Sequence, residues 1–169
     1  MIHRRQICLA LVLLVIFCAG EARAFVFPPG DSLARTDGFV VLGGATFSSR
    51  VTTAVADVQR FPGTTLLISN PTRLPCPRVP VPHACFTPHP YSTQGEARAA
   101  RAYADAHHWR SITVITSADQ IGRARVRFRR CWPGPLRMRI APSSIAHRLR
   151  QIPYETAAVA KAEIWQRGC

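Results

Sequence analysis

Four short, largely apolar runs separated by segments of helical character constrain the fold of this chain more than any other feature. The runs are residues 39–42, 65–69, 111–116 and 136–140. Their length and β-branched residues predict strands, and the last run, in which Arg alternates with apolar residues, predicts a strand nearer a sheet edge. Because strands that alternate with helices are joined by crossovers, we expect an α/β fold with a mainly parallel sheet of about four to five strands, covered on both faces.

The intervening segments carry apolar residues at helical spacing. They predict helices over residues 50–61, 93–109 and 121–132, and a last helix that begins at Pro153. In this last helix Tyr154, Ala158, Ala162 and Trp165 are expected to face inward. Residues 70–92 are rich in proline and show no periodicity, so they predict a long ordered loop.

The N-terminus has the three parts of a secretory signal peptide. Basic residues at positions 3–5 precede an apolar stretch of 14 residues, Ile7–Gly20, and Ala22-Arg23-Ala24 offers the small residues that signal peptidase reads. We predict a signal peptide over 1–24, an N-terminal extension over 25–36 and an α/β domain over 37–169. The protein is then exported, to the secreted, cell-surface or periplasmic side. The stretch is short for a membrane span, which needs about 20 residues; an uncleaved N-terminal membrane anchor is the alternative.

Four cysteines follow the predicted cleavage site, and an even number in an exported chain indicates disulfides. Cys76 and Cys85 lie in one Pro-rich stretch, so a local bridge is the simplest choice, which leaves Cys131 with Cys169. The alternative is a zinc site of Cys76, His83, Cys85 and His89, but its spacing matches no common zinc motif and an oxidising compartment favours the disulfide. We therefore expect no metal and no other cofactor.

The formal net charge of +13 at pH 7 comes from 22 basic residues, of which only Lys161 is lysine, and loss of the signal peptide lowers it to +11. The densest basic run comprises Arg123, Arg125, Arg127, Arg129 and Arg130. Two interpretations stay open: a solvated helix face, or contact with anionic surface polymers or lipid headgroups. Nucleic acid is not an expected partner, because no aromatic residues interleave with these arginines and the compartment is wrong.

Candidate binding residues follow the predicted strands at their carboxyl ends, where parallel sheets bind ligands. Arg50 and Arg123 lie just inside helix N-termini, where the helix dipole disfavours a cation, so we expect them to contact an anionic ligand. The other candidates are Gly43, Gly44, Ser69, Thr93, Thr116 and Ser117. Each also has a plainer explanation: a tight turn for the glycines, a capping box of Thr93 with Glu96, and helix caps for Thr116 and Ser117.

Five short sequence features follow one another along the chain: Gly43-Gly44, Arg50, Ser69, Ser92-Thr93 with Glu96-Ala97, and Val114-Ile115-Thr116-Ser117 with Arg123-Ala124. This ordered set, spread over about Asp37 to Trp165, resembles the YdcF/SanA/ElyC-like family, a domain of unknown function associated with the bacterial cell envelope. The resemblance implies a Rossmann-like three-layer sandwich in an exported or anchored protein, without an established reaction. S-adenosylmethionine binding is ascribed to the family, but we do not expect it of this chain, because that cofactor is intracellular and the chain is expected to be exported.

The chain departs from the family pattern at three places. Ala45 stands where a third glycine is usual, Asn70-Pro71 where Gly-Gly usually follows Ser69, and Asp119-Gln120 where Tyr-His is usual. The lost histidine matters most, because imidazole is the side chain best able to transfer a proton near neutral pH. Glu96 and Asp119 are therefore the candidate catalytic residues.

Three functions stay open. The first is an exported, envelope-associated domain that binds a small ligand bearing phosphate or carboxylate, such as an envelope precursor. The second is a hydrolase or transferase acting on cell-wall or lipid-carrier intermediates, with Glu96 or Asp119 as base. The third is a non-catalytic structural or interaction protein with a decayed site. A serine hydrolase built on Ser117 is disfavoured because the surrounding residues form no nucleophile elbow, although His89 or His147 could approach it in space.

Overall fold

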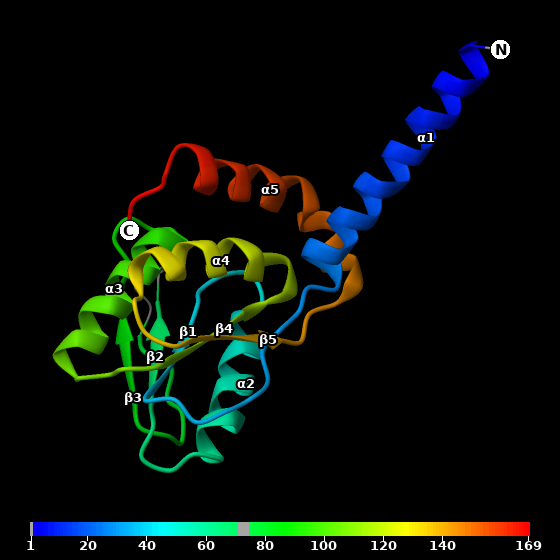
Figure 1. The fold of residues 1–169 in the computed structure, drawn as a ribbon. Helices are drawn as coiled ribbons and strands as arrows, with labels where there is room; N and C mark the ends of the chain where they lie inside the picture. The colour runs from blue at the N-terminus through cyan, green and yellow to red at the C-terminus, as the bar shows by residue number, and fades with distance from the viewer. Residues whose placement is uncertain (1, 71–74) are drawn as a thin grey trace.

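The computed structural model describes residues 2–70 and 75–169 (Figure 1). Its centre is a five-stranded sheet in which every neighbouring pair is parallel and the strand order is β3-β2-β1-β4-β5. The strands are β1 (Gly38–Val41), β2 (Thr65–Ser69), β3 (His83–Phe86), β4 (Ile112–Ser117) and β5 (Leu136–Ala141). The predicted α/β class is confirmed, as is the position of the Arg-containing strand, β5, at a sheet edge.

Helices cover both faces of the sheet and give it three layers. The chain moves along the sheet in one direction from β1 to β2 and in the other from β3 through β4 to β5. Crossovers of the same hand therefore place α2 on one face and α3 and α4 on the other. These helices are α2 (Phe47–Gln59), α3 (Thr93–Ala106) and α4 (Ala118–Cys131), and α5 (Ile145–Ile164) packs on the outside of α4. This is the expected Rossmann-like three-layer sandwich.

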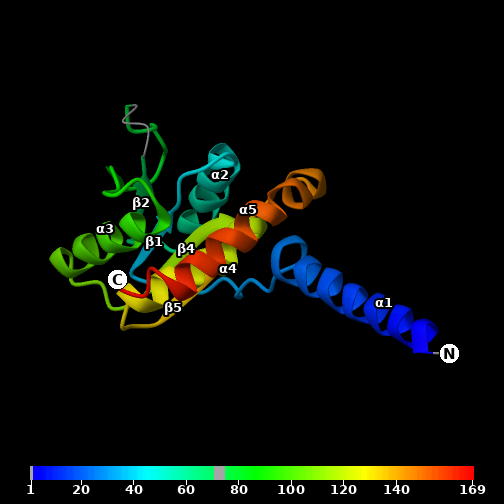
Figure 2. The same cartoon turned by 90° about the horizontal axis from the view of Figure 1, so that it is seen from above.

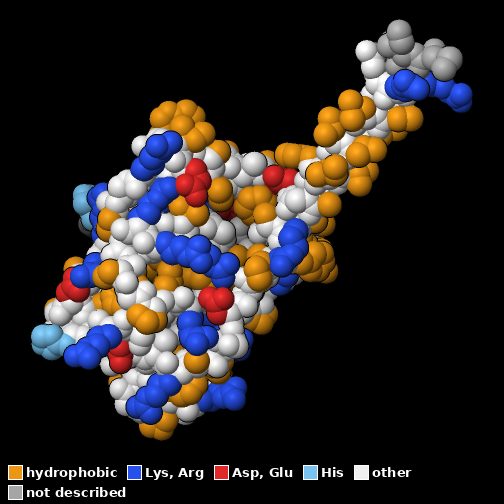
Figure 3. All heavy atoms as spheres, viewed as in Figure 1, with side chains coloured by type: hydrophobic (Ala, Val, Ile, Leu, Met, Phe, Trp, Pro, Cys, Tyr) orange, Lys and Arg blue, Asp and Glu red, His pale blue; other side chains and the backbone are white. Residues whose placement is uncertain are grey.

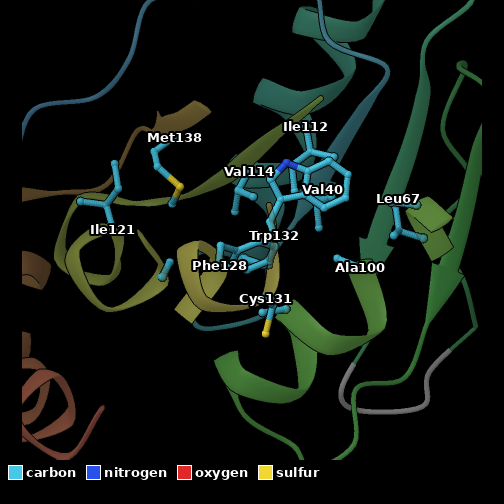
Figure 4. Close-up of a cluster of buried hydrophobic side chains, with 14 residues drawn as sticks. Val40, Leu67, Ala100, Ile112, Val114, Ile121, Phe128, Cys131, Trp132 and Met138 are labelled. Carbon is cyan, nitrogen blue, oxygen red and sulfur yellow. The ribbon is translucent and has the colours of Figure 1, made fainter. Parts of the chain in front are cut away.

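The strands have apolar side chains on both faces, so each face builds its own core. On the α3 and α4 face, Val40, Leu67 and Val114 pack against helix residues such as Ala100 and Phe128 (Figure 4). On the α2 face, strand residues such as Phe39, Val41 and Ile68 pack against α2. This double burial explains why the strands read as continuous apolar runs rather than as alternating ones.

The prediction of a loop over residues 70–92 missed β3. This strand pairs with β2 from Leu66 opposite His83 to Ser69 opposite Phe86. Its four residues are only half-buried and stand among prolines, so they carry neither the apolar run nor the alternation that marks a strand. The Cys76–Cys85 disulfide ties β3 to the chain that leads into it.

The predicted last helix starts too late, and its expected inward face is right only in part: Ala162 is fully buried as expected. Helix α5 begins at Ile145, where the Ser144 hydroxyl accepts a hydrogen bond from the His147 amide at 3.2 Å, and Pro153 lies inside it. Tyr154 and Trp165, expected inside, are 61% and 76% exposed, whereas Glu155 is 2% exposed. The expected inward face of this helix is apolar, but α5 packs against arginine side chains of α4.

The arginine run of α4 supplies those arginines. The aligned Arg123, Arg127 and Arg130 face α5, which crosses over α4 in Figure 2. Arg127 is 4% exposed and donates to Gln166, and Arg130 donates to the Ala162 carbonyl and to Glu163. A solvated face is therefore the wrong interpretation for these three residues.

The N-terminal segment forms a continuous apolar helix that projects from the domain. Helix α1 (Ile2–Glu21) runs into a short π-helix, η1 (Ala22–Val26). The segment Arg4–Val26 contains an 18-residue apolar stretch with a mean hydropathy of 2.2 that is not buried in the protein, so by length and composition it suits a signal sequence or a membrane anchor. The span is longer than the 14-residue apolar stretch suggested, because apolar residues continue past Gly20.

Both expected disulfides are present, Cys76–Cys85 and Cys131–Cys169, and they fit an oxidising, exported environment. Cys8 and Cys18, in α1, are free. The second bridge joins the end of α4 to the segment that follows α5, so it closes α5 onto the domain.

The two bridges should contribute unequally to stability. Loop-closure entropy increases with the number of residues enclosed, which is 38 for Cys131–Cys169 and 9 for Cys76–Cys85. Replacing both cysteines by alanine should lower the free energy of unfolding by about 4 kcal/mol for the first pair and about 3 kcal/mol for the second. Guanidinium unfolding of the two double variants measures both, and a larger loss in Cys76→Ala/Cys85→Ala would contradict the loop-length argument.

Candidate functional site

An open pocket of about 280 Å³ lies at the carboxyl ends of β1 and β4. The strand order reverses between these two strands, and such a switch point is where open α/β sheets bind ligands. The turn after β1, the first turns of α3 and α4, and the N-terminal half of α5 line the pocket, which we call the edge pocket. Its volume suits a ligand smaller than a drug-sized molecule.

Seven of the ten predicted site residues line the edge pocket: Gly43, Gly44, Arg50, Thr93, Glu96, Asp119 and Arg123. The other three, Ser69, Thr116 and Ser117, are fully buried at the ends of β2 and β4. They form the layer beneath the pocket, so they support its walls and do not meet a ligand directly.

Arg50 joins the end of β1 to the end of β4. It is 2% exposed and donates through Nη1 to the Leu42 and Gly43 carbonyls, through Nη2 to the Ser117 hydroxyl at 2.9 Å, and through Nε to Thr46. The Ser117 hydroxyl therefore accepts a hydrogen bond from Arg50 and makes no cap hydrogen bond to α4. Burial lowers the pKa of Arg50 to about 10, so the guanidinium is still charged at neutral pH.

Gly44 makes room for this guanidinium. Its φ of +135° lies in the region that favours glycine, and a Cβ there would stand 3.1 Å from both terminal nitrogens of Arg50. The expected tight turn is therefore present, and it exists because the turn wraps around a buried cation.

Glu96 is not part of a capping box. The cap of α3 is Ser92, whose hydroxyl accepts from the Gly95 amide at 3.3 Å. The Glu96 carboxylate instead accepts a hydrogen bond from the Gly43 amide at 2.7 Å, across the edge pocket floor. Burial raises the pKa of Glu96 above its ordinary value, although the nearby Ser69 hydroxyl, the Gly43 amide and the charges of Arg50 and Arg123 oppose this shift.

Gln120 belongs to a chain of polar contacts. Its Oε1 accepts from the Thr116 hydroxyl at 2.8 Å, and its Nε2 donates to the Thr93 hydroxyl at 3.4 Å. These contacts link β4, α4 and α3 at the wall of the edge pocket, which Gln120 and Thr93 line. Gln120 therefore holds the pocket together, and as an amide it transfers no proton.

Arg123 forms a buried ion pair that the sequence did not reveal. Its Nε and Nη2 each donate to one Glu155 carboxylate oxygen at 2.8 Å, and its Nη1 donates to Thr93 at 2.7 Å. Burial alone would lower the pKa of Arg123, but the hydrogen bonds and charge of Glu155 outweigh it and raise that pKa. Glu155 comes from a helix expected to begin at Pro153, in an alanine-rich context that gives no signal of a buried acid.

His147 is the second residue of the site without a clear sequence signal. Its Nε2 lies 3.8 Å from Oδ2 of Asp119, which is 4% exposed, and both side chains line the edge pocket. The sequence relates His147 only to Ser117, which His89 or His147 could approach in space. Its position in the first turn of α5, outside the predicted helix, hid its relation to Asp119. Helix α5 thus brings an imidazole into the site.

The alternative zinc site is absent from the described residues, because Cys76 and Cys85 form a disulfide and no cluster of metal-ligating side chains occurs within residues 2–70 and 75–169.

Compared with known proteins, the chain matches no protein-family model, no curated protein and no solved structure.

The raised pKa of Glu96 predicts a pH-dependent cost of keeping this carboxyl buried. Above its ordinary value of 4.5 the unfolded chain loses the proton first, so the free energy of unfolding falls with rising pH until the folded protein ionises too. Glu96→Gln keeps the hydrogen-bond acceptor and cannot ionise. Its stability relative to the unmodified protein should therefore increase as pH rises from about 4 to about 8.

Urea unfolding across this pH range measures the difference. The matched control is Glu163→Gln on α5, an exposed carboxylate paired with Arg130, which should show no such rise. A Glu96→Gln difference that does not change with pH would contradict the buried, pKa-shifted carboxyl.

Proposed function

We propose that this protein is an exported, envelope-associated α/β domain whose edge pocket binds a small ligand bearing a phosphate or carboxylate group. The observation that carries the proposal is the convergence of Arg50 and Arg123, from different helices, on one pocket at the sheet's switch point. The first turns of α3 and α4 line the same pocket, and helix N-termini favour anions.

The charges around the pocket support an anionic ligand. Arg123 is balanced by Glu155, but within the described residues Arg50 has no carboxylate at salt-bridge distance. Burial raises the pKa of Glu96, and its carboxyl group is hydrogen-bonded to the Gly43 amide rather than to Arg50. A single anionic group bound in the pocket would balance the positive charge of Arg50. The guanidinium of Arg123, 13% exposed, is the cation that such a group can reach.

We further propose that the chain is a divergent member of the YdcF/SanA/ElyC-like family. The fold is the one that the resemblance implies, and most of the residues that carry the resemblance lie in or beneath one pocket. Two disulfides and an N-terminal apolar helix support the expected export. Anionic surface polymers or lipid headgroups stay as candidate larger partners, with Arg129, exposed on α4, as a basic residue free of the α5 contact.

Ligand binding is tested by isothermal titration of the full chain in detergent micelles, with inorganic phosphate, acetate and glucose 1-phosphate as probes. Arg123→Lys keeps the charge but loses the guanidinium fork, so affinity should fall about tenfold or more. Arg129→Lys on the same helix is the matched control and should bind as the unmodified protein does.

Equal affinity of Arg123→Lys and the unmodified protein would refute the assignment of Arg123. Absence of saturable binding of all three probes would instead favour the structural or interaction protein with a decayed site.

Acid–base turnover in the same pocket is the second candidate, favoured by the pairing of His147 with Asp119. Catalytic hydrogen bonds are often long in a ligand-free site, and the 3.8 Å separation can shorten when a ligand binds. Asp119 would orient the imidazole, which would accept or supply the proton. The buried Glu96 is a second group able to hold a proton.

A hydrolase is tested with 4-nitrophenyl phosphate and 4-nitrophenyl acetate as model substrates. Loss of a general acid or base costs about 100-fold or more, so Asp119→Asn, His147→Gln and Glu96→Gln should each lower kcat accordingly. Asp105→Asn, at the end of α3, and His107→Gln, at its C-cap, are exposed controls that should leave kcat unchanged. Turnover that survives all three pocket substitutions would exclude these residues as acid or base, and the binding function would stand alone.

A further inference from the structure

The predicted cleavage site lies within a helix that is docked on the domain. Helix η1 continues α1 across the Ala24–Phe25 bond, and Phe25 and Val26 are 5% and 2% exposed. They pack against α4 and α5. The apolar helix and the domain are therefore joined without a flexible linker, which differs from a signal sequence followed by a loose extension.

Two polar contacts fix the same junction to α5. The Thr156 hydroxyl donates to Oε2 of Glu21 at 2.6 Å, and Arg148 donates through Nη1 to the Val26 carbonyl at 2.8 Å. Glu21 lies before the predicted cleavage site, so cleavage would remove one of these contacts. The residues before and after the site thus act as one structural unit with α5.

The surface of the domain around this junction is apolar and exposed. Phe27, Ile145 and Leu149 are 62%, 55% and 52% exposed. Positions 145, 149, 152 and 156 follow one stripe of a helix, so Ile145 and Leu149 extend the stripe whose Thr156 meets Glu21. We call Phe27, Ile145 and Leu149, with the exposed Arg23, the foot surface. Figure 3 shows apolar side chains that cover α1 and continue onto the domain at its base.

We propose that α1 is retained as a membrane anchor and that the foot surface rests on the bilayer that α1 crosses. Helix α1 has 20 residues and is about 30 Å long, which matches a hydrocarbon core of about 30 Å. This length places the end of α1, and with it the foot surface, at the membrane interface. The bilayer explains why apolar side chains of that size are exposed there.

The charges fit the same placement. Arg4 and Arg5 at the far end of α1 favour the cytoplasmic side, which puts the domain on the exported side. Arg23 stands at the near end, where it can reach lipid phosphates from the interface. The edge pocket uses a different side of α5, through His147 and Gln151. The inference therefore does not depend on the proposed ligand.

The first experiment determines whether α1 is retained. The full chain is expressed in a bacterium, the cells are fractionated, and the N-terminus of the protein is sequenced. We expect an unprocessed chain in membranes, resistant to carbonate extraction and released by detergent. A protein that begins at Phe25 in a soluble exported fraction would overturn the proposal.

The second experiment tests contact of the foot surface with lipid. A Cys8→Ser/Cys18→Ser chain carrying Leu149→Cys is labelled with an environment-sensitive fluorophore and reconstituted into phosphatidylcholine–phosphatidylglycerol vesicles containing lipids brominated near the headgroup. Ala106→Cys, exposed at the far end of α3, is the matched control (Figure 1). Ile145→Cys serves as a second foot position.

Bromolipid quenching should be several-fold stronger at positions 149 and 145 than at position 106. Equal quenching at all three positions, in a protein still anchored by α1, would show that the domain stands away from the bilayer and would overturn the surface contact.

Discussion

The buried guanidinium of Arg50 is the interaction on which the carboxyl edge of the sheet depends. It binds the turn after β1 through two carbonyls and the end of β4 through the Ser117 hydroxyl. These two paired strands are the ones between which the connection reverses, and the loops that leave them in opposite directions open a crevice beyond their carboxyl ends. A cation with several donors in one plane is suited to span it. The glycine turn and the buried Glu96 are arranged around this charge.

A second consequence of buried charge is the polar packing of α5. Helices in most domains associate through apolar stripes, but α4 presents Arg123, Arg127 and Arg130 to α5. A buried ion pair such as Arg123–Glu155 contributes little net stability and is costly to break, so it defines position more than it adds affinity. The Cys131–Cys169 disulfide supplies the covalent restraint that such an interface needs.

The sequence predicted most of the scaffold because the strands are buried on both faces and the helices have clear boundaries. Both disulfides and the residues of the pocket wall on α2, α3 and α4 follow from that scaffold. Strand β3 could not be predicted, since four half-buried residues among prolines show no period. Glu155 and His147 could not be predicted because they lie on a helix whose inward face is polar. Glu96 was assigned to a local cap because its true partner, Gly43, is 53 residues away.

The edge pocket draws its fourth wall from α5, which follows every other element of the site along the chain. For a polypeptide that crosses a membrane from its N-terminus, this wall is the last to emerge. The Cys131–Cys169 bond can form only after α5 has passed, and Arg123 meets Glu155 only when α5 is in place. On the proposed export, the site is complete only after translocation of α5 and formation of this disulfide.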